Sequence, residues 1–293
     1  MKNYWELTKS LPNQLNQEVV QDFLLSLKLA NKSEGTVTQY RRYLEKFFGD
    51  MQQPFTSISS DEIQQWVQKH GSHLSEKTLR FRLSILSSFF TFCVNENQIE
   101  SSPIKSRWFP RLQKPLPKYL DKEEVAKVRR ESEFDTLRNQ VLIEFLLSTG
   151  CRVSEVHRLD IQDVDVENRT ARVIGKGKKI RHVHFTEKCA VLMERYLGMR
   201  SISNAPFFVT RGRRRLSVRM IQHILKEMGE KSGLNSNLHP HRLRHTFATE
   251  LLSKGAELSF IADELGHADI GTTQIYARLP KREIVALYRK YMG

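Results

Sequence analysis

The C-terminal part of the chain contains the stretch HPHRLRHTFATELLSKGAELSFIADELGHADIGTTQIYARL, residues 239–279. Its first seven residues contain three histidines and two arginines: His239, His241, Arg242, Arg244 and His245. His267 follows a Leu-Gly turn, and Tyr276 lies nine residues later. Guanidinium groups, imidazoles and a nucleophilic hydroxyl are the groups that metal-free chemistry on a phosphate ester requires. The stretch therefore predicts a site that acts on a phosphate.

The composition indicates a globular protein with a polyanionic partner. The length of 293 residues suggests about two domains, and 39% of the residues are hydrophobic. Residues 1–100 hold 11 Lys+Arg and 11 Asp+Glu, so residues 101–293 carry the whole formal net charge of +14. Such a surplus points most simply to nucleic acid, although a surface that only keeps the protein soluble is the alternative.

The sequence shows no signal peptide and no apolar run of about 18 residues. We therefore expect a cytoplasmic, nucleoid-associated protein with no membrane partner. Cys93, Cys151 and Cys189 are far apart and form no CxxC pair, which argues against a disulfide framework and a cysteine zinc site.

Helical periodicity predicts four helices in a domain over residues 14–100. Ser59 with Glu62 forms a predicted capping box, and Ser75 opens the last helix. Residues 101–120 contain four prolines and five cations but no acid, which predicts an extended interdomain linker along DNA. A capping box at Asp121 and Glu124 then begins a second domain over residues 121–293.

The second domain is predicted to combine helices with a small antiparallel β-sheet. A helix over 141–148 ends at Gly150, and Arg152 follows it in TGCRVSE. Alternating patterns predict strands over 164–166, 170–174 and 180–185, with a lysine-rich turn over 175–179. A short strand over 206–209 and helices from residue 218 onward complete the pattern. The fold class is mainly α with a small antiparallel sheet.

Metal chemistry is the less favoured interpretation of the histidine-rich stretch. His239, His241 and His245 are interrupted by Pro240 and two arginines, and cations beside a dication repel it. No paired carboxylates have the spacing of a two-metal nuclease. We expect no metal and no cofactor.

Each candidate residue is weak evidence by itself. Arg152 or Arg244 alone is more often an ordinary ion-pair residue, and a lone Tyr276 is usually a core residue. Together, TGCRVSE, GKGKK, HPHRLRHT, LGHAD and TTQIYARL occur in an order and spacing that resembles the tyrosine recombinase (phage integrase) family. The resemblance covers essentially the whole chain and is to the minimal two-domain type, similar to Xer recombinases and transposon resolvases.

The resemblance implies a SAM-like four-helix core-binding domain and a mixed α/β catalytic domain. It also implies that Arg152 and Arg244 clamp the scissile phosphate while Tyr276 attacks it, which yields a 3′-phosphotyrosine and a free 5′-hydroxyl. Glu155 is expected to buttress Arg152 or His241.

Three further catalytic positions follow from the same resemblance. Lys176 is expected to protonate the leaving 5′-oxygen, with Lys178 and Lys179 as rivals for this role. His241 is expected to act as acid and base, and His267 is expected to assist the contact with the phosphate.

The implied partner is a double-stranded DNA core site, bound by a homotetramer or by a heterotetramer with a paralogous recombinase. Strand exchange through a Holliday junction would resolve, excise or integrate DNA, and a C-terminal helix at about 281–293 would dock on a neighbouring protomer. A type IB topoisomerase and an inert DNA-binding protein are the alternatives. The candidate DNA contacts are Arg41, Arg42, Lys77, Arg80, Arg107, Lys178, Arg211, Arg213 and Arg214.

Overall fold

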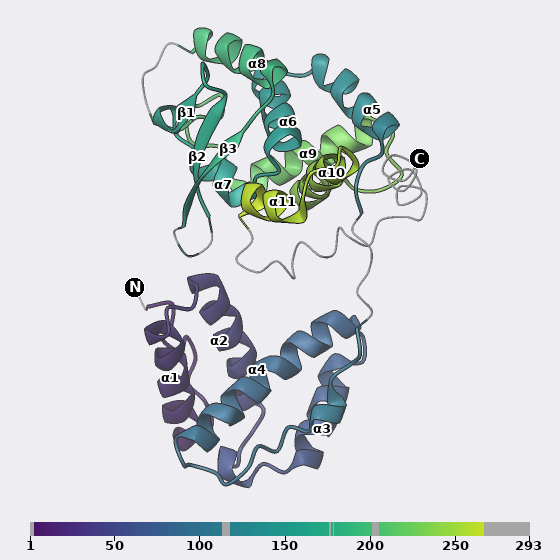
Figure 1. Ribbon diagram of the computed structural model, residues 1–293. Helices are drawn as coiled ribbons and strands as arrows, with labels where there is room; N and C mark the ends of the chain where they lie inside the picture. Colours follow the sequence, from purple (N-terminus) through teal and green to yellow (C-terminus); the bar gives the residue numbers. More distant parts are fainter. Residues whose placement is uncertain (1–2, 113–117, 176, 178, 201–204, 267–293) are drawn as a thin grey trace. The chain divides into compact units, whose positions relative to one another are not determined.

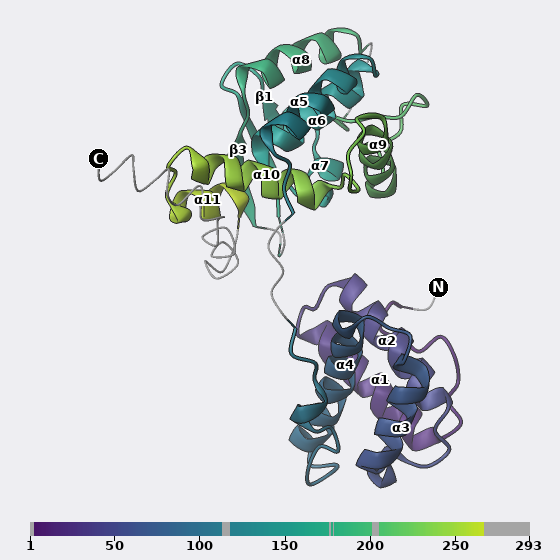
Figure 2. The ribbon, with the colours of Figure 1, turned by 90° about the vertical axis from the view of Figure 1, so that its right-hand side faces the viewer.

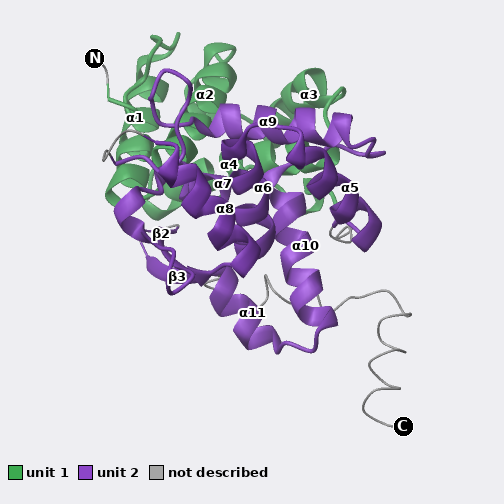
Figure 3. Ribbon diagram, turned by 90° about the horizontal axis from the view of Figure 1, so that it is seen from above, with its two compact units in different colours: residues 1–114 green, residues 115–293 purple. Residues whose placement is uncertain are grey.

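The computed structural model describes residues 3–112, 118–175, 177, 179–200 and 205–266. The chain divides into two compact units, Met1–Lys114 and Pro115–Gly293, which Figure 3 colours separately. The described residues are mostly helical and contain a small antiparallel sheet, so the predicted fold class is confirmed. No helix among them is both long and apolar enough to cross a membrane.

The first unit is the predicted four-helix bundle (Figure 1). Its helices are α1 (Gln14–Leu29), α2 (Glu34–Gly49), α3 (Ser60–Gly71) and α4 (Glu76–Asn95). Each helix begins behind a side chain that accepts a backbone N–H, which removes one unpaired donor at the helix start. The capping box of Ser59 and Glu62 and the N-cap at Ser75 are both confirmed.

Aromatic rings fill the centre of this bundle. Phe47, Phe48, Phe89 and Phe90 are fully buried. The ring centroids of Phe48 and Phe89 lie 5.0 Å apart in an edge-to-face pair, the arrangement that the ring quadrupoles favour. The side chains of α2 and α4 therefore interlock in the core of the first unit.

The buried side chain of Asn16 connects α1 to the segment between α2 and α3. Its Nδ2 donates to the carbonyl of Gln53 (2.9 Å), and its Oδ1 accepts the N–H of Phe55 (2.7 Å). The side chain is 0% exposed, so both contacts are made away from water. Asn16 thus satisfies two backbone groups that the irregular segment leaves without partners.

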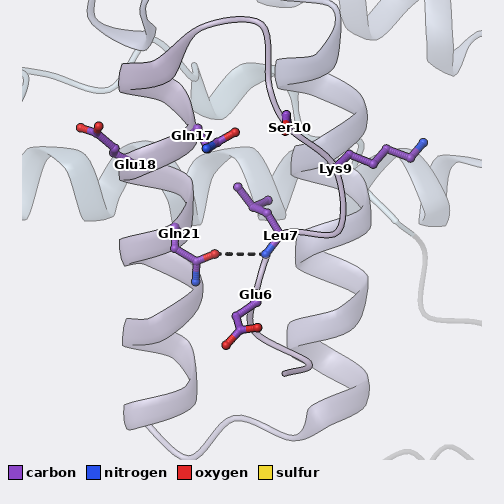
Figure 4. Close-up of a pocket in the computed structure, with 7 residues that line it drawn as sticks. All are labelled: Glu6, Leu7, Lys9, Ser10, Gln17, Glu18 and Gln21. Atoms are coloured by element: carbon purple, nitrogen blue, oxygen red, sulfur yellow. Dashed lines mark hydrogen bonds between the residues drawn. The ribbon is translucent and has the colours of Figure 1, made fainter. Parts of the chain in front are cut away.

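The residues before α1 also lie against the bundle. The N–H of Leu7 donates to Oε1 of Gln21 (3.0 Å), as Figure 4 shows. The N–H and hydroxyl of Thr8 both donate to Glu45. A pocket between this segment and α1 is lined by Glu6, Leu7, Lys9, Ser10, Gln17, Glu18 and Gln21. The first unit therefore extends ahead of residue 14, where the predicted domain begins.

The segment predicted as a linker is held at both ends. Ile104 and Trp108 pack against the core of the first unit, and the hydroxyl of Ser60 donates to the carbonyl of Pro103 (2.8 Å). Leu120 is buried in the core of the second unit, where its N–H donates to the hydroxyl of Thr246 (2.8 Å). The prolines and cations predict a chain that is extended over the whole segment. Instead, Ile104, Trp108 and Leu120 pack against the cores of the two units, because burial of apolar side chains is favourable.

The second unit is organised around a central helix, α6. Its described helices are α5 (Lys122–Glu133), α6 (Leu137–Thr149), α7 (Val153–Arg158), α8 (Glu187–Gly198), α9 (Val218–Lys231), α10 (Pro240–Ser253) and α11 (Leu258–Leu265). α6 is buried on nearly every face and packs against α5, α8 and α10 (Figure 2). Two predictions are confirmed here: the capping box of Asp121 and Glu124 opens α5, and Gly150 ends α6.

The sheet consists of β1 (Val164–Asp165), β2 (Thr170–Ile174) and β3 (Ile180–His184), paired antiparallel in that order. These are the three predicted strands, with β1 and β3 each ending one residue earlier. The prediction of a strand over 206–209 is wrong. Only isolated bridges occur there, and the guanidinium of Arg200 binds the carbonyls of Pro206 and Phe207 (3.0 and 2.7 Å) that strand pairing would need.

We expect Asn16→Ala to lower the free energy of unfolding of the first unit by about 2–3 kcal/mol, because two backbone groups lose their partner. All three tryptophans lie within Met1–Lys114, so tryptophan fluorescence during urea unfolding reports on this unit alone. The control is Gln14→Ala, an exposed position of the same helix, with an expected change below about 0.5 kcal/mol. Similar losses in both variants would contradict the role of Asn16.

Candidate active site

The C-terminal turn of α11 is bound by three arginines. Nε of Arg181 donates to the carbonyl of Glu264 (3.1 Å), and Nη2 of Arg244 donates to that of Leu265 (2.7 Å). Nη2 of Arg152 donates to the next carbonyl, that of Gly266 (3.2 Å). Carbonyls at a helix C-terminus lack partners within the helix and carry partial negative charge, so guanidinium groups are favourable partners.

Arg244 also connects α11 to the central helix. Its Nη1 donates to the carbonyl of Gly150, the residue that ends α6, at 2.7 Å. Gly150 and Gly266 both have left-handed backbones, with φ of 59° and 61°. At each glycine the left-handed backbone turns the chain away from its helix. The carbonyls of Gly150 and Leu265 are then free to accept hydrogen bonds from Arg244. The side chain is only 4% exposed, so its orientation is fixed by the fold.

Arg152 lies at the N-terminus of α7, where its side chain is 26% exposed. Its Nη1 donates to Oε1 of Glu155 (2.9 Å), and its backbone N–H donates to Oε2 of the same carboxylate (2.8 Å). Of the two partners considered for Glu155 from the sequence, the structure pairs it with Arg152. Arg152 and Arg244, far apart in sequence, are brought together on consecutive carbonyls of one turn.

Glu155 is a buried carboxylate shared by two arginines. Nη1 and Nη2 of Arg181 donate to its two oxygens at 2.8 and 2.9 Å. Burial raises the pKa of Glu155, but the hydrogen bonds and charge of Arg181, together with those from Arg152, outweigh this and lower the pKa overall. Glu155 is therefore ionised at neutral pH, and it carries one negative charge against two positive ones.

Arg181 is a site residue that the sequence interpretation missed. It lies on β3 two residues before the buried Val183, so strand alternation places it on the inward face. A charged residue at an inward strand position is a signal of a buried partner. His184 on the same strand contacts Oε1 of Glu264 through Nδ1 (2.9 Å), a second connection between β3 and α11.

His241 lies in the first turn of α10, near both Arg152 and Arg244. Although the residue is exposed, partial burial of its imidazole lowers its pKa first, and the charges of Arg244 and then Arg152 lower it further. The imidazole is therefore neutral at pH 7. It can accept a proton from a nucleophile or hydrogen-bond an anion held by the two arginines.

Comparison with known proteins assigns the chain to a family. Residues 118–283 match the model described as phage integrase family, and residues 20–97 match phage integrase, N-terminal SAM-like domain. The chain belongs to the phage integrase family. The resemblance predicted from the motifs is confirmed.

Relatives in this family are tyrosine recombinases. The chain is 32% identical over 268 residues to tyrosine recombinase XerC of Actinobacillus pleuropneumoniae serotype 7, covering 87% of each protein. It is 33% identical over 274 residues to tyrosine recombinase XerA of Pyrococcus horikoshii, covering 92% of each.

Solved structures share the fold. The crystal structure of XerA recombinase has a TM-score of 0.56 at 26% identity and covers 94% of this chain and 98% of that one. XerH site-specific recombinase bound to palindromic difH substrate in a post-cleavage complex has a TM-score of 0.75 and covers 99% and 92%. At 21% identity, the second comparison shows the fold alone.

Two residues of the histidine-rich stretch, His239 and Arg242, stabilise the structure. Nδ1 of His239 accepts the N–H of Arg242 (3.2 Å) and caps α10. Arg242 is 4% exposed and forms an ion pair with Glu124 (2.8 Å) in the capping box of α5. Within the described ranges, no group of three or more His, Cys, Asp or Glu residues is placed to hold a metal ion.

Lys176, Lys178, His267 and Tyr276 lie outside the described residues. Gly175, which precedes Lys176, and Gly266, which precedes His267, both lie close to the group formed by Glu155, Arg152 and Arg181. A Cβ on Gly175 would lie 3.3 Å from Oε1 of Glu155, and Gly266, which precedes His267, contacts Arg152 and Arg181. Gly175 therefore lies near Glu155 and Arg181, and Gly266 lies against Arg152 and Arg181.

The candidate DNA contacts differ in their environment. Arg41 donates to the carbonyls of Tyr4 and Glu6 and its side chain is 12% exposed, so it holds the N-terminal segment within the first unit. Arg80 donates to the carbonyl of Pro110 (2.7 Å). The remaining described candidates are exposed: Arg42, Lys77, Arg107, Arg211, Arg213 and Arg214.

We expect Gly150→Ala to destabilise the second unit by about 2–4 kcal/mol, because a left-handed alanine is strained and its Cβ would overlap the ring of Phe247. That Cβ would lie 2.5 Å from Cδ1 of Phe247. Gly198→Ala is the matched control, since its Cβ meets nothing within 4 Å. Differential scanning calorimetry of the full chain measures both, and a neutral Gly150→Ala would contradict the packing at the end of α6.

We expect His245 to stay neutral well below pH 6. Burial, followed by the charges of His241, Arg244 and His239, lowers its pKa to about 4. Because an unfolded histidine titrates near 6.5, the unfolded chain binds more protons between these values, and acidification through this window lowers the free energy of unfolding. An NMR titration assigned with His245→Gln measures the pKa, and a value at or above 6.5 would contradict the prediction.

Proposed function

We propose that this member of the phage integrase family is a site-specific recombinase that cleaves and rejoins double-stranded DNA through a 3′-phosphotyrosine intermediate. The observation that best supports this is the placement of Arg152 and Arg244 on consecutive carbonyls of the α11 turn, with His241 beside both. Two rigidly held guanidinium groups suit the charge that develops on the non-bridging oxygens of a phosphodiester under attack.

In the proposed reaction, Oη of Tyr276 attacks the scissile phosphorus and its proton passes to neutral His241. The bond between phosphorus and the 5′-oxygen breaks, and Lys176 gives that oxygen its proton. His267 contributes a further contact to the phosphate. The phosphotyrosine bond conserves the energy of the broken phosphodiester, so a 5′-hydroxyl of another strand can reverse the attack without ATP.

The proposed partner is a short duplex core site. Exposed cations of both units, among them Lys77 and Arg213, would contact its phosphates, which predicts an affinity that falls steeply with salt. Strand exchange needs two duplexes, so we propose a tetramer of this chain, or of this chain and a paralogous recombinase, acting through a Holliday junction on nucleoid DNA in the cytoplasm. Residues 281–293 would dock on a neighbouring protomer.

A nicked suicide substrate that carries the cognate site tests this chemistry. We expect a covalent protein–DNA adduct that forms in EDTA and is abolished by Tyr276→Phe, because the phenol oxygen is the proposed nucleophile. Arg244→Lys should slow adduct formation by about 100-fold, since a single ammonium cannot replace the oriented fork. Tyr40→Phe, in the first unit, is the control and should react normally.

The result that contradicts the proposal is an adduct that survives Tyr276→Phe or requires magnesium. A type IB topoisomerase is the second candidate, because it would form a similar adduct. A plasmid with two core sites separates the two activities. A recombinase yields resolved circles, whereas a topoisomerase only removes supercoils.

A further inference from the structure

We propose that Arg181 is a positioning residue for the reaction: it neutralises Glu155 so that Arg152 remains available to the phosphate, and it fixes the turn that leads to His267. The inference rests on the proposed function, because it assigns Arg181 a role in that same site. Arg181 would act through its neighbours and not by contact with DNA.

The contacts of Arg181 use all three nitrogens of its guanidinium group. Nη1 and Nη2 form a bidentate pair with Glu155 (2.8 and 2.9 Å), and Nε donates to the carbonyl of Glu264 (3.1 Å). The side chain is only 14% exposed, and the carboxylate of Glu155 is 0% exposed. Arg181 is therefore held in one orientation between α7 and α11.

The charges explain why Arg152 depends on this pair. Glu155 is a buried anion whose oxygens accept from both Arg152 and Arg181. A buried carboxylate without enough cations strongly attracts the one that remains. Without Arg181, the guanidinium of Arg152 would be the only full positive charge hydrogen-bonded to Glu155. It would be drawn toward Glu155 and away from a bound phosphate.

The packing around Arg181 adds a second effect. A Cβ on Gly266 would lie 2.9 Å from Cδ and Nη1 of Arg181, so the glycine allows the turn to lie directly against this side chain. A Cβ on Gly175 would lie 3.4 Å from Nη1 of Arg181. Arg181 thus lies against Gly266 and close to Gly175.

Lysine cannot reproduce this arrangement. Its ammonium group is a single donor centre, whereas the contacts to Glu155 and to the carbonyl of Glu264 need a planar fork with a third N–H beside it. Arg181→Lys keeps the charge and loses the geometry. Arg181→Met removes both and keeps an unbranched apolar side chain.

The test compares cleavage with binding on the suicide substrate. With enzyme saturating, we expect the single-turnover rate of adduct formation to fall about 30-fold in Arg181→Met and about 10-fold in Arg181→Lys, since a shift of about 1 Å in a positioned group can reduce rates by up to 100-fold. The Kd for the same DNA, measured by fluorescence anisotropy, should change by less than about twofold.

Arg172→Met is the matched control. Arg172 lies on the adjacent strand β2 and forms its ion pair with Asp163, away from Glu155. The Arg172→Met substitution should leave both the cleavage rate and the Kd unchanged. All rates are measured at a temperature at which circular dichroism shows every variant folded.

A double mutant separates positioning from general destabilisation. In a Glu155→Gln background no buried anion needs neutralising, so adding Arg181→Met should cost less than about tenfold further in rate, the part that depends on the contact of Arg181 with the α11 turn. A full 30-fold further loss, or normal cleavage by folded Arg181→Met and Arg181→Lys, would overturn the inference. If the unmodified chain forms no Tyr276-dependent adduct, the proposed function itself fails; a normal adduct with unaffected Arg181 variants refutes only the role of Arg181.

Discussion

The arrangement of the second unit depends on how the end of α11 is capped. A helix leaves its last carbonyls without partners, and the left-handed Gly266 turns the chain sharply away from them. Arg152, Arg181 and Arg244 bind three successive carbonyls of this turn. Because these arginines come from α7, β3 and α10, a single turn of backbone fixes four elements relative to one another.

This capping also concentrates positive charge at one place. Three guanidinium groups repel one another, and their approach is stabilised by the partial negative charge of the helix end and by the carboxylate of Glu155. Two buried carboxylates, Glu155 and Glu264, act on these three cations, which leaves a positive charge uncompensated. A phosphodiester is the kind of ligand that such a site favours. Partial burial, together with the charges of Arg244 and Arg152, lowers the pKa of His241 and keeps it in the neutral form that a proton acceptor needs.

Features that depend on residues close in sequence were predicted correctly. The capping box of Ser59 and Glu62 and the stop at Gly150 need only a few neighbouring residues to form. The hairpin of β2 and β3 follows equally from strand alternation and a glycine-containing turn. The predicted strand over 206–209 does not form, because Arg200, which lies outside that segment, donates hydrogen bonds to two of its carbonyls.

Residue order alone is enough to predict the helical bundle, the small sheet and the family, since periodicity, caps and motif order are all local or linear properties. Which cations lie in the same site becomes visible only in the folded chain. Arg181 meets a carbonyl 83 residues away, and Arg152 meets one 114 residues away. In the sequence, Arg41 and Arg242 look as available for a ligand as the other arginines do. In the structure, Arg41 donates to the carbonyl of Glu6, and Arg242 forms an ion pair with Glu124. Hydrogen bonds and ion pairs depend on distance in space, which leaves no trace in the local pattern of the chain.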